Sequence, residues 1–290
     1  MARFALTGIT GNVGRHAASL LLAGGDNVRA VVRSEASAAP WRARGAEIAI
    51  AQLADAHAMT AAFAGTDGVY VMTPTWFEAE DMFAENERAV AALGKALRAA
   101  KPAKVVLLSS IGGQHAHGTG AILKLNHMEC AFADIPGITA LRAAWFMENF
   151  AGLVDHVALT GRLPSMLAPL DQQVPMVATK DIGEMVAALL NRPEAAPRFV
   201  ELEGPRRYAP IDVAAAFTSV LERPVEANIL PANAWNETYR SWGLTPKSAV
   251  AMSEMLAGFN DRHIVFEHAR DDTIHGDTTL EAVLATLNAK

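Results

Sequence analysis

The sequence predicts an α/β protein built on a doubly wound parallel sheet, with a smaller α+β region after it. Short apolar segments alternate with longer helical segments through the first half of the chain, as they do in β-α-β crossover units. Three glycines spaced three apart separate the first apolar segment from the first helical one. Segments such as "VVLL" are apolar on both faces, which is typical of strands that helices cover on both sides.

The expected strands are short and rich in valine, leucine and isoleucine. They are residues 4–7, 28–32, 47–50, 69–72, 105–108 and 139–141. Helical segments lie between them, at residues 14–24, 56–65, 77–100 and 123–133. This order predicts a parallel sheet with helices on both faces.

Many prolines interrupt the second half of the chain, where we expect two short strands at residues 174–177 and 198–204. Two further helices are expected at residues 180–191 and 211–222. We expect residues 1–150 to form the first domain. Residues 151–290 would form a smaller region that is partly interwoven with it and can return a strand to its sheet, so the boundary is not sharp.

The composition is that of a soluble globular protein, with 290 residues, 51% hydrophobic and 19% charged. The net charge of −6 argues against a general affinity for nucleic acid or anionic membranes. The single Cys130 excludes an intrachain disulfide, favours a reducing compartment and is expected to be a small buried side chain. With no leader peptide and no apolar run of membrane-spanning length expected, the prediction is a cytoplasmic protein.

The stretch "TGITGNVG" contains Gly8, Gly11 and Gly14 between a strand and a helix. Such a turn brings the free amides of the helix to one point, where they attract phosphate. Glycines let a pyrophosphate approach the backbone, and the last one lets the helix pack closely on the strand. A purely structural turn is the alternative, but the strand–turn–helix context predicts a dinucleotide-binding loop.

The end of the second strand reads "VVRS" and carries Arg33. In dinucleotide-binding folds an acidic residue here binds the ribose 2′-hydroxyl, whereas an arginine accommodates a 2′-phosphate. Arg33 therefore predicts NADP(H) as the cofactor, with NAD(H) still possible. The alternative is an ordinary solvent-exposed arginine.

The chain resembles the NmrA-like family of atypical short-chain dehydrogenase/reductases, and within it the NAD(P)H:quinone oxidoreductases. The motifs that carry the resemblance are "TGITGNVG", "VRAVVRS", "AFAGTDGVYVMTP", "VVLLSSIGG", "ITALRAAWFMENF", "KDIGEMVAALL" and "GDTTLEAVLATL". The resemblance implies that residues 1–150 form an NAD(P)-binding Rossmann domain and that residues 151–290 form the substrate side. The cofactor would lie across the carboxyl ends of the strands.

The resemblance also implies roles for individual residues. Beside the cofactor it places Gly8, Thr10, Gly11, Asn12, Val13, Gly14, Arg33, Gln52, Leu53, Thr73, Pro74, Ser109, Ser110 and Lys124. Beside the nicotinamide or the substrate it places Trp145, Phe146 and Asn149. Gln52 departs from the family, which often has aspartate near the adenine.

Typical short-chain dehydrogenases use a tyrosine, followed four residues later by a lysine, to protonate the developing alkoxide. None of the three tyrosines, Tyr70, Tyr208 and Tyr239, has a lysine at that spacing. The candidate catalytic residues are instead Lys124 and His127, either of which can hold the ribose or donate a proton. The alternative is that both are polar residues on a helix surface.

Two other groups of residues have open interpretations. His115 and His117 lack further ligands at a recognisable spacing, so no metal is expected and a solvated loop or a substrate lid is favoured. Trp235, Tyr239 and Trp242 either pack the smaller region or line an apolar pocket for a flat substrate.

The sequence leaves two functions open. The first is NAD(P)H-dependent reduction of a quinone, or of a similar small conjugated or aromatic compound, by hydride transfer. The second is a non-catalytic NADP-binding redox sensor of the NmrA type. Hydride transfer needs little beyond the cofactor and an apolar slot, and the aromatic cluster favours the enzyme. The expected partner is a flat, apolar small molecule, and the expected state is a monomer or homodimer.

Overall fold

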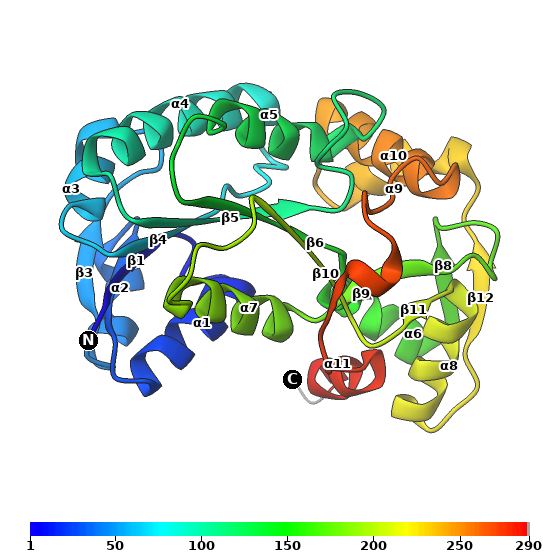
Figure 1. Ribbon diagram of the computed structural model, residues 1–290. Helices are drawn as coiled ribbons and strands as arrows, with labels where there is room; N and C mark the ends of the chain where they lie inside the picture. Colours follow the sequence, from blue (N-terminus) through cyan, green and yellow to red (C-terminus); the bar gives the residue numbers. More distant parts are fainter. Residues whose placement is uncertain (289–290) are drawn as a thin grey trace.

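The computed structural model describes residues 1–288 and has an eight-stranded sheet at its centre (Figure 1). The strand order is β13-β10-β6-β5-β4-β1-β2-β3, and every pair of neighbours in it is parallel. The strands are β1 (Arg3–Leu6), β2 (Asn27–Val32), β3 (Glu47–Ile50), β4 (Gly68–Val71), β5 (Lys104–Ser110), β6 (Ile138–Ala143), β10 (Phe199–Glu203) and β13 (Ile274–His275). The predicted doubly wound α/β class is confirmed.

Helices cover both faces of this sheet, as Figure 1 shows. One layer contains α3 (Ala56–Phe63), α4 (Met82–Ala100) and α5 (Leu123–Ala131); the other contains α1 (Asn12–Ala23), α2 (Glu35–Arg42) and α7 (Thr179–Asn191). Each layer has its own apolar core. Met59, Leu93 and Met128 pack in the first, and Leu21 and Leu190 pack in the second.

The second half of the chain is interwoven with the first. β10 and β13 extend the central sheet beyond β6, and α7 packs against α1. Its other strands form two small sheets, one of β7 (Trp145–Phe146), β9 (Val174–Val177) and β11 (Arg207–Tyr208), the other of β8 (Arg162–Ser165) and β12 (Glu226–Ile229). Its other helices are α6 (Val154–Thr160), α8 (Pro210–Leu221), α9 (Ala232–Ser241), α10 (Pro246–Asn260) and α11 (Leu280–Asn288). Short 3-10 segments are η1 (Gly120–Ile122), η2 (Met147–Leu153) and η3 (Arg270–Asp272).

Cys130 and helix α2 differ from what the sequence predicts. The expectation of a buried Cys130 is wrong, because its side chain is exposed while its neighbours Met128 and Glu129 face inward. Helix α2 is not among the predicted helices and has Pro40 inside it; Ser34 caps it by accepting the Ser37 amide at 3.4 Å. Within residues 1–288, no helix is both long and apolar enough to cross a membrane.

A buried ionic network joins α5 to the central sheet. The guanidinium of Arg142 on β6 donates to both carboxylate oxygens of Glu129 on α5, at 3.0 and 2.8 Å. The hydroxyl of Ser109 on β5 donates to the same carboxylate at 2.5 Å. Arg142 also donates to Glu267 at 2.7 Å, which brings the C-terminal part of the chain into the network. The Arg142 side chain is only 3% exposed, so these bonds form in a region of low dielectric.

Two carboxylates of β10 fix the segment of residues 267–270 along the sheet. Glu201 accepts the backbone amides of Glu267 and His268 at 2.9 and 3.0 Å. The fully buried Glu203 accepts the Nε–H of Arg270 at 2.9 Å. The strand that the second half returns to the sheet therefore also positions the chain that follows α10.

We predict that Arg142→Ala lowers the free energy of unfolding by about 3–5 kcal/mol, because it leaves the Glu129 carboxylate buried without its cation. Urea unfolding followed by circular dichroism measures this loss. The control is Arg98→Ala, which removes an ion pair to Asp134 at the surface and is expected to shift the midpoint little. Equal losses for the two variants would mean that water solvates the Glu129 carboxylate.

Candidate functional site

Two of the three glycines in the loop after β1 are required by the packing of the chain itself. Gly8 has a φ of +60°, and a Cβ there would lie 2.6 Å from the side chain of Met72. A Cβ on Gly14 would lie 2.4 Å from the carbonyl oxygen of Gly8. These glycines let α1 start directly against the end of β1.

Gly11 is different, because nothing in the described chain requires a glycine there. Its φ of −83° suits any residue, and a Cβ would meet only the Gly8 carbonyl oxygen, at 3.3 Å. Gly11 is exposed with its neighbours Thr10 and Asn12, whereas Val13 is buried. Helix α1 has neither a side-chain cap nor an acidic residue in its first turn. The free amides at this open position fit a phosphate group.

The carboxyl ends of β2 and β3 lie at the same edge of the sheet as this loop. Arg33 follows β2, is exposed, and forms no ion pair with any residue in 1–288. Gln52 and Leu53 follow β3, with Gln52 exposed and Leu53 half-buried. A free guanidinium at this position fits an anionic group such as a ribose phosphate.

Thr73 and Pro74 follow β4, and Ser109 and Ser110 end β5, the next strand of the sheet. The Thr73 hydroxyl is buried and has no hydrogen-bond partner within the described part of the chain. The Ser109 hydroxyl is already donated to Glu129, which leaves Ser110 as the half-buried serine at this edge.

Lys124 is the second residue of α5 and lies beside Pro74. Its Nζ donates to the carbonyl oxygen of Pro74 at 2.8 Å, and its own carbonyl accepts the side-chain amide of Asn86 at 3.0 Å. Burial lowers the pKa of Lys124 to about 7. An amine with this pKa can both accept and donate a proton near neutral pH.

The structure does not bring His127 to the same place. His127 is exposed and lies with Glu87 and Arg98 in a hollow on the outer surface of α4 and α5. The inward side of α5 is taken by Lys124 and Met128. His127 therefore does not join the other predicted site residues.

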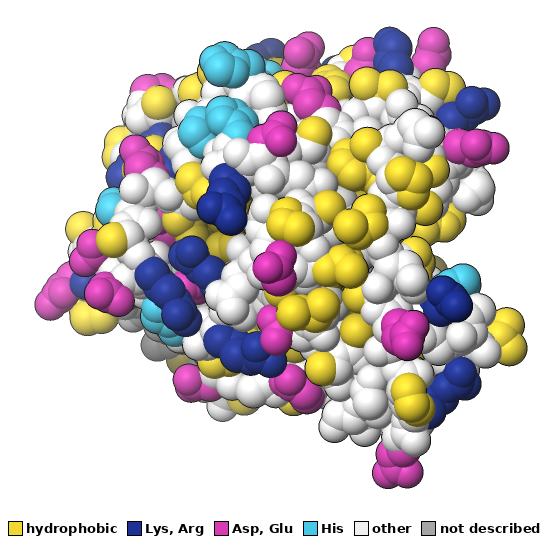
Figure 2. Space-filling view, turned by 90° about the vertical axis from the view of Figure 1, so that its right-hand side faces the viewer, with side chains coloured by type: hydrophobic (Ala, Val, Ile, Leu, Met, Phe, Trp, Pro, Cys, Tyr) yellow, Lys and Arg dark blue, Asp and Glu magenta, His cyan; other side chains and the backbone are white. Residues whose placement is uncertain are grey.

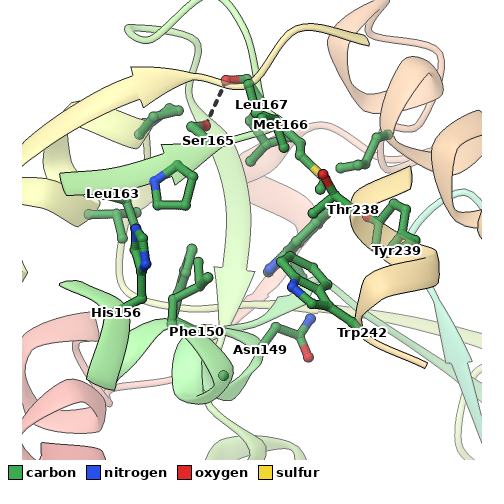
Figure 3. A pocket seen from close by; sticks show the side chains of 18 residues that line it. Asn149, Phe150, His156, Leu163, Ser165, Met166, Leu167, Thr238, Tyr239 and Trp242 are labelled. Carbon is green, nitrogen blue, oxygen red and sulfur yellow. Dashed lines mark hydrogen bonds between the residues drawn. The ribbon is translucent and has the colours of Figure 1, made fainter. Parts of the chain in front are cut away.

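A cavity of about 600 Å³ lies in the second half of the chain (Figure 3). Most of its lining is apolar or aromatic: Trp145, Phe150, Leu153, Leu163, Pro164, Met166, Leu167, Pro210, Val213, Leu230, Tyr239, Trp242 and Leu256. Trp145 follows β6 by two residues, so the cavity begins near the carboxyl edge of the central sheet. Figure 2 shows many hydrophobic side chains on this side of the molecule.

The predicted substrate residues divide between cavity and core. Trp145 and Asn149 line the cavity, whereas Phe146 packs against the core. Of the aromatic cluster, Tyr239 and Trp242 line the cavity, and Trp235 is a packing residue whose indole N–H donates to the Leu230 carbonyl at 2.8 Å. Burial raises the pKa of Tyr239, which keeps its phenol neutral.

Sequence reasoning missed the opposite side of the cavity, formed by Phe150, His156 and residues 163–167. The pairing of β8 with β12, more than sixty residues away in sequence, brings Leu230 beside them, and the Leu230 amide donates to the Ser165 carbonyl at 2.7 Å. No local pattern in the sequence indicates this pairing.

His115 and His117 lie close to a third histidine, His263, three residues after the end of α10. The His115 and His263 rings are 4.3 Å apart, and the nitrogen Nε2 of His263 lies 3.0 Å from the carbonyl oxygen of His117. Among residues 1–288, no group of three or more potential ligands has a geometry that would hold a metal ion. The histidines instead hold the loop after β5 against α10.

The parallel sheet and the glycine turn from β1 into α1 define a protein of the Rossmann-like α/β class. The chain belongs to the NmrA-like family, whose model matches residues 2–282. The predicted family membership is confirmed.

Related proteins include a sequence relative and two solved structures. NAD(P)H azoreductase of Xenophilus azovorans is 24% identical over 254 residues, covering 87% of this chain and 85% of that protein. The NADPH complex of a quinone oxidoreductase from Escherichia coli superposes with a TM-score of 0.81 at 20% identity, covering 98% of this chain and 99% of the other. The NADP(H) complex of triphenylmethane reductase from Citrobacter sp. gives a TM-score of 0.82 at 17% identity, with 99% of each chain covered. The two solved structures confirm the fold.

We predict that Lys124 makes the stability of the ligand-free protein depend on pH. Because its pKa is about 7 when folded and about 10.5 in a freely solvated lysine, the unfolded chain binds more protons between these values. Stability therefore rises with pH across this window, by up to about 1.4 kcal/mol per pH unit. The measurement compares urea unfolding of the native protein and of Lys124→Met from about pH 7 to about pH 9.5. Parallel profiles for the two proteins would contradict the burial of a neutral amine.

Proposed function

We propose that this protein is an NADPH-dependent reductase of small, flat aromatic or conjugated compounds such as quinones or azo compounds. The observation that carries the proposal is that three features lie at the same edge of the central sheet, at the carboxyl ends of its strands. They are the open glycine loop, the buried Lys124 and the start of the aromatic cavity. The names of the azoreductase, the quinone oxidoreductase and the triphenylmethane reductase support the same reaction class.

In this proposal the cofactor is bound by residues that the protein's own packing leaves available. The amides after Gly11 bind the pyrophosphate, and Arg33 pairs with the 2′-phosphate. NADPH supplies the hydride when it is bound.

Lys124 is the proposed proton donor. Its Nζ donates to the Pro74 carbonyl, and the Lys124 carbonyl accepts the side-chain amide of Asn86. With a pKa of about 7, Nζ can release a proton to a substrate oxygen or nitrogen near neutral pH. Tyr70 is fully buried and Tyr208 accepts the amide of Leu280 at 3.1 Å, whereas Tyr239 lines the cavity with a phenol whose pKa burial raises.

The aromatic cavity is the proposed substrate pocket. Trp145, Tyr239 and Trp242 present ring surfaces on which a flat molecule can stack, and the apolar lining excludes water from the reacting atoms. The non-catalytic sensor is the competing function. A sensor would need the cofactor loop, but its function would not require a large apolar cavity.

We predict that the native protein binds NADPH more tightly than NADH and that Arg33→Ala removes most of the difference. A charge-assisted contact to a 2′-phosphate corresponds to about tenfold to a hundredfold in affinity. Titration calorimetry with both cofactors measures the ratio. Arg44→Ala is the matched control, because this arginine stacks on Trp41 instead. Equal native affinities for NADPH and NADH would refute the role of Arg33.

The enzyme itself is tested by NADPH oxidation with a panel of quinones, azo compounds and enones. We predict turnover with at least one class, and a loss of about 10²–10⁴-fold in kcat for Lys124→Met where protonation limits the rate. His127→Ala is expected to match the native protein, and Gly11→Val is expected to fold without binding NADPH. Tight NADPH binding with no turnover of any compound would favour the sensor.

A further inference from the structure

His156 is one of the cavity side chains that has no hydrogen-bonding role in the protein's own structure. His156 lies on α6, is exposed, and its imidazole forms no hydrogen bond or ion pair with any residue in 1–288. In Figure 3 its ring stands on one side of the cavity, and the rings of Tyr239 and Trp242 stand on the other. Both imidazole nitrogens are therefore free to bind a ligand.

The cavity lining contains no acidic residue. None of the eighteen lining residues is aspartate, glutamate, lysine or arginine. The Ser165 hydroxyl, which also lines the cavity, is already donated to the Leu167 carbonyl at 2.8 Å. An anionic substituent of a ligand would therefore not be repelled by a carboxylate in this cavity. A cationic substituent would have no carboxylate to pair with.

The cavity has an inner and an outer end. Trp145 follows the central strand β6 and marks the inner end, near the edge of the sheet where the cofactor loop lies. His156 belongs to α6, which packs against β8 of the outer two-stranded sheet. A volume of about 600 Å³ is in the range of pockets that bind drug-sized ligands, so a substrate of more than one ring can reach from one end to the other.

Resting on the reductase function proposed above, we propose that the cavity selects extended aromatic substrates with a carboxylate or sulfonate at the end away from the reacting atoms. His156 is the specificity-determining residue, and its imidazole N–H donates a hydrogen bond to that anionic group. A hydrogen bond to an ionised acceptor is stronger than one between neutral groups. The reacting part of the substrate then lies toward Trp145 and the sheet edge.

The test uses two azo dyes that differ in one group. Methyl orange carries a sulfonate on its terminal ring, and 4-(dimethylamino)azobenzene has the same skeleton without it. Binding of each dye to the full-length protein is followed by quenching of tryptophan fluorescence, since Trp145 and Trp242 line the cavity. We expect His156→Phe to weaken methyl orange binding by about tenfold to a hundredfold and to leave the uncharged dye within about twofold.

Two further variants make the result specific. His156→Gln keeps a neutral hydrogen-bond donor, so it is expected to bind methyl orange with an affinity between those of the native protein and His156→Phe. His57→Phe makes the same substitution at an exposed position on α3, outside the cavity, and is expected to bind both dyes as the native protein does.

The inference is overturned if His156→Phe affects both dyes equally, since His156 would then be only part of the wall. It is also overturned if neither dye is affected. The dye titration requires no turnover, so it is independent of the test of the reductase. A protein that binds methyl orange through His156 but oxidises no NADPH would refute the proposed reaction and leave the recognition of the anionic group standing.

Discussion

The buried pair of Glu129 and Arg142 is the constraint on which the rest of the site depends. A carboxylate and a guanidinium in a region of low dielectric are tolerated only when their hydrogen bonds are satisfied, and here Ser109 and Glu267 complete the network. Because Glu129 lies on α5, the pair fixes the rotation of that helix against the sheet. This rotation turns Lys124 toward Pro74 and leaves His127 at the surface.

The cofactor side and the substrate side are also joined by the loop after β4. The amide of Thr245, which caps α10, donates to the Phe77 carbonyl at 3.2 Å, and Lys247 pairs with Asp81 at 2.9 Å. Trp76 of the same loop packs near Met252 on α10. Helix α10 packs in turn against α9, which carries Tyr239 and Trp242. The loop that provides the acceptor for Lys124 is therefore attached to the helices that wall the cavity.

Most of the fold could be predicted because short stretches of the sequence indicate its strands, helices and turns. Apolar strands alternating with helices predict the parallel sheet, and the glycine spacing predicts the turn into α1. The orientation of α5 could not be predicted, because it depends on the ion pair between Glu129 on this helix and Arg142 on strand β6. His156 was missed because it lies on α6, a helix that the sequence did not predict, in a cavity whose lining comes from segments far apart in sequence.

The low pKa of Lys124 follows from the same constraint. The buried amine has the Pro74 carbonyl as its hydrogen-bond acceptor, and no carboxylate forms an ion pair with it among residues 1–288. Burial without a counter-charge favours the neutral amine, whereas negative charge brought to this edge of the sheet favours the protonated one. The neutral amine is therefore the less costly form to bury in the ligand-free protein.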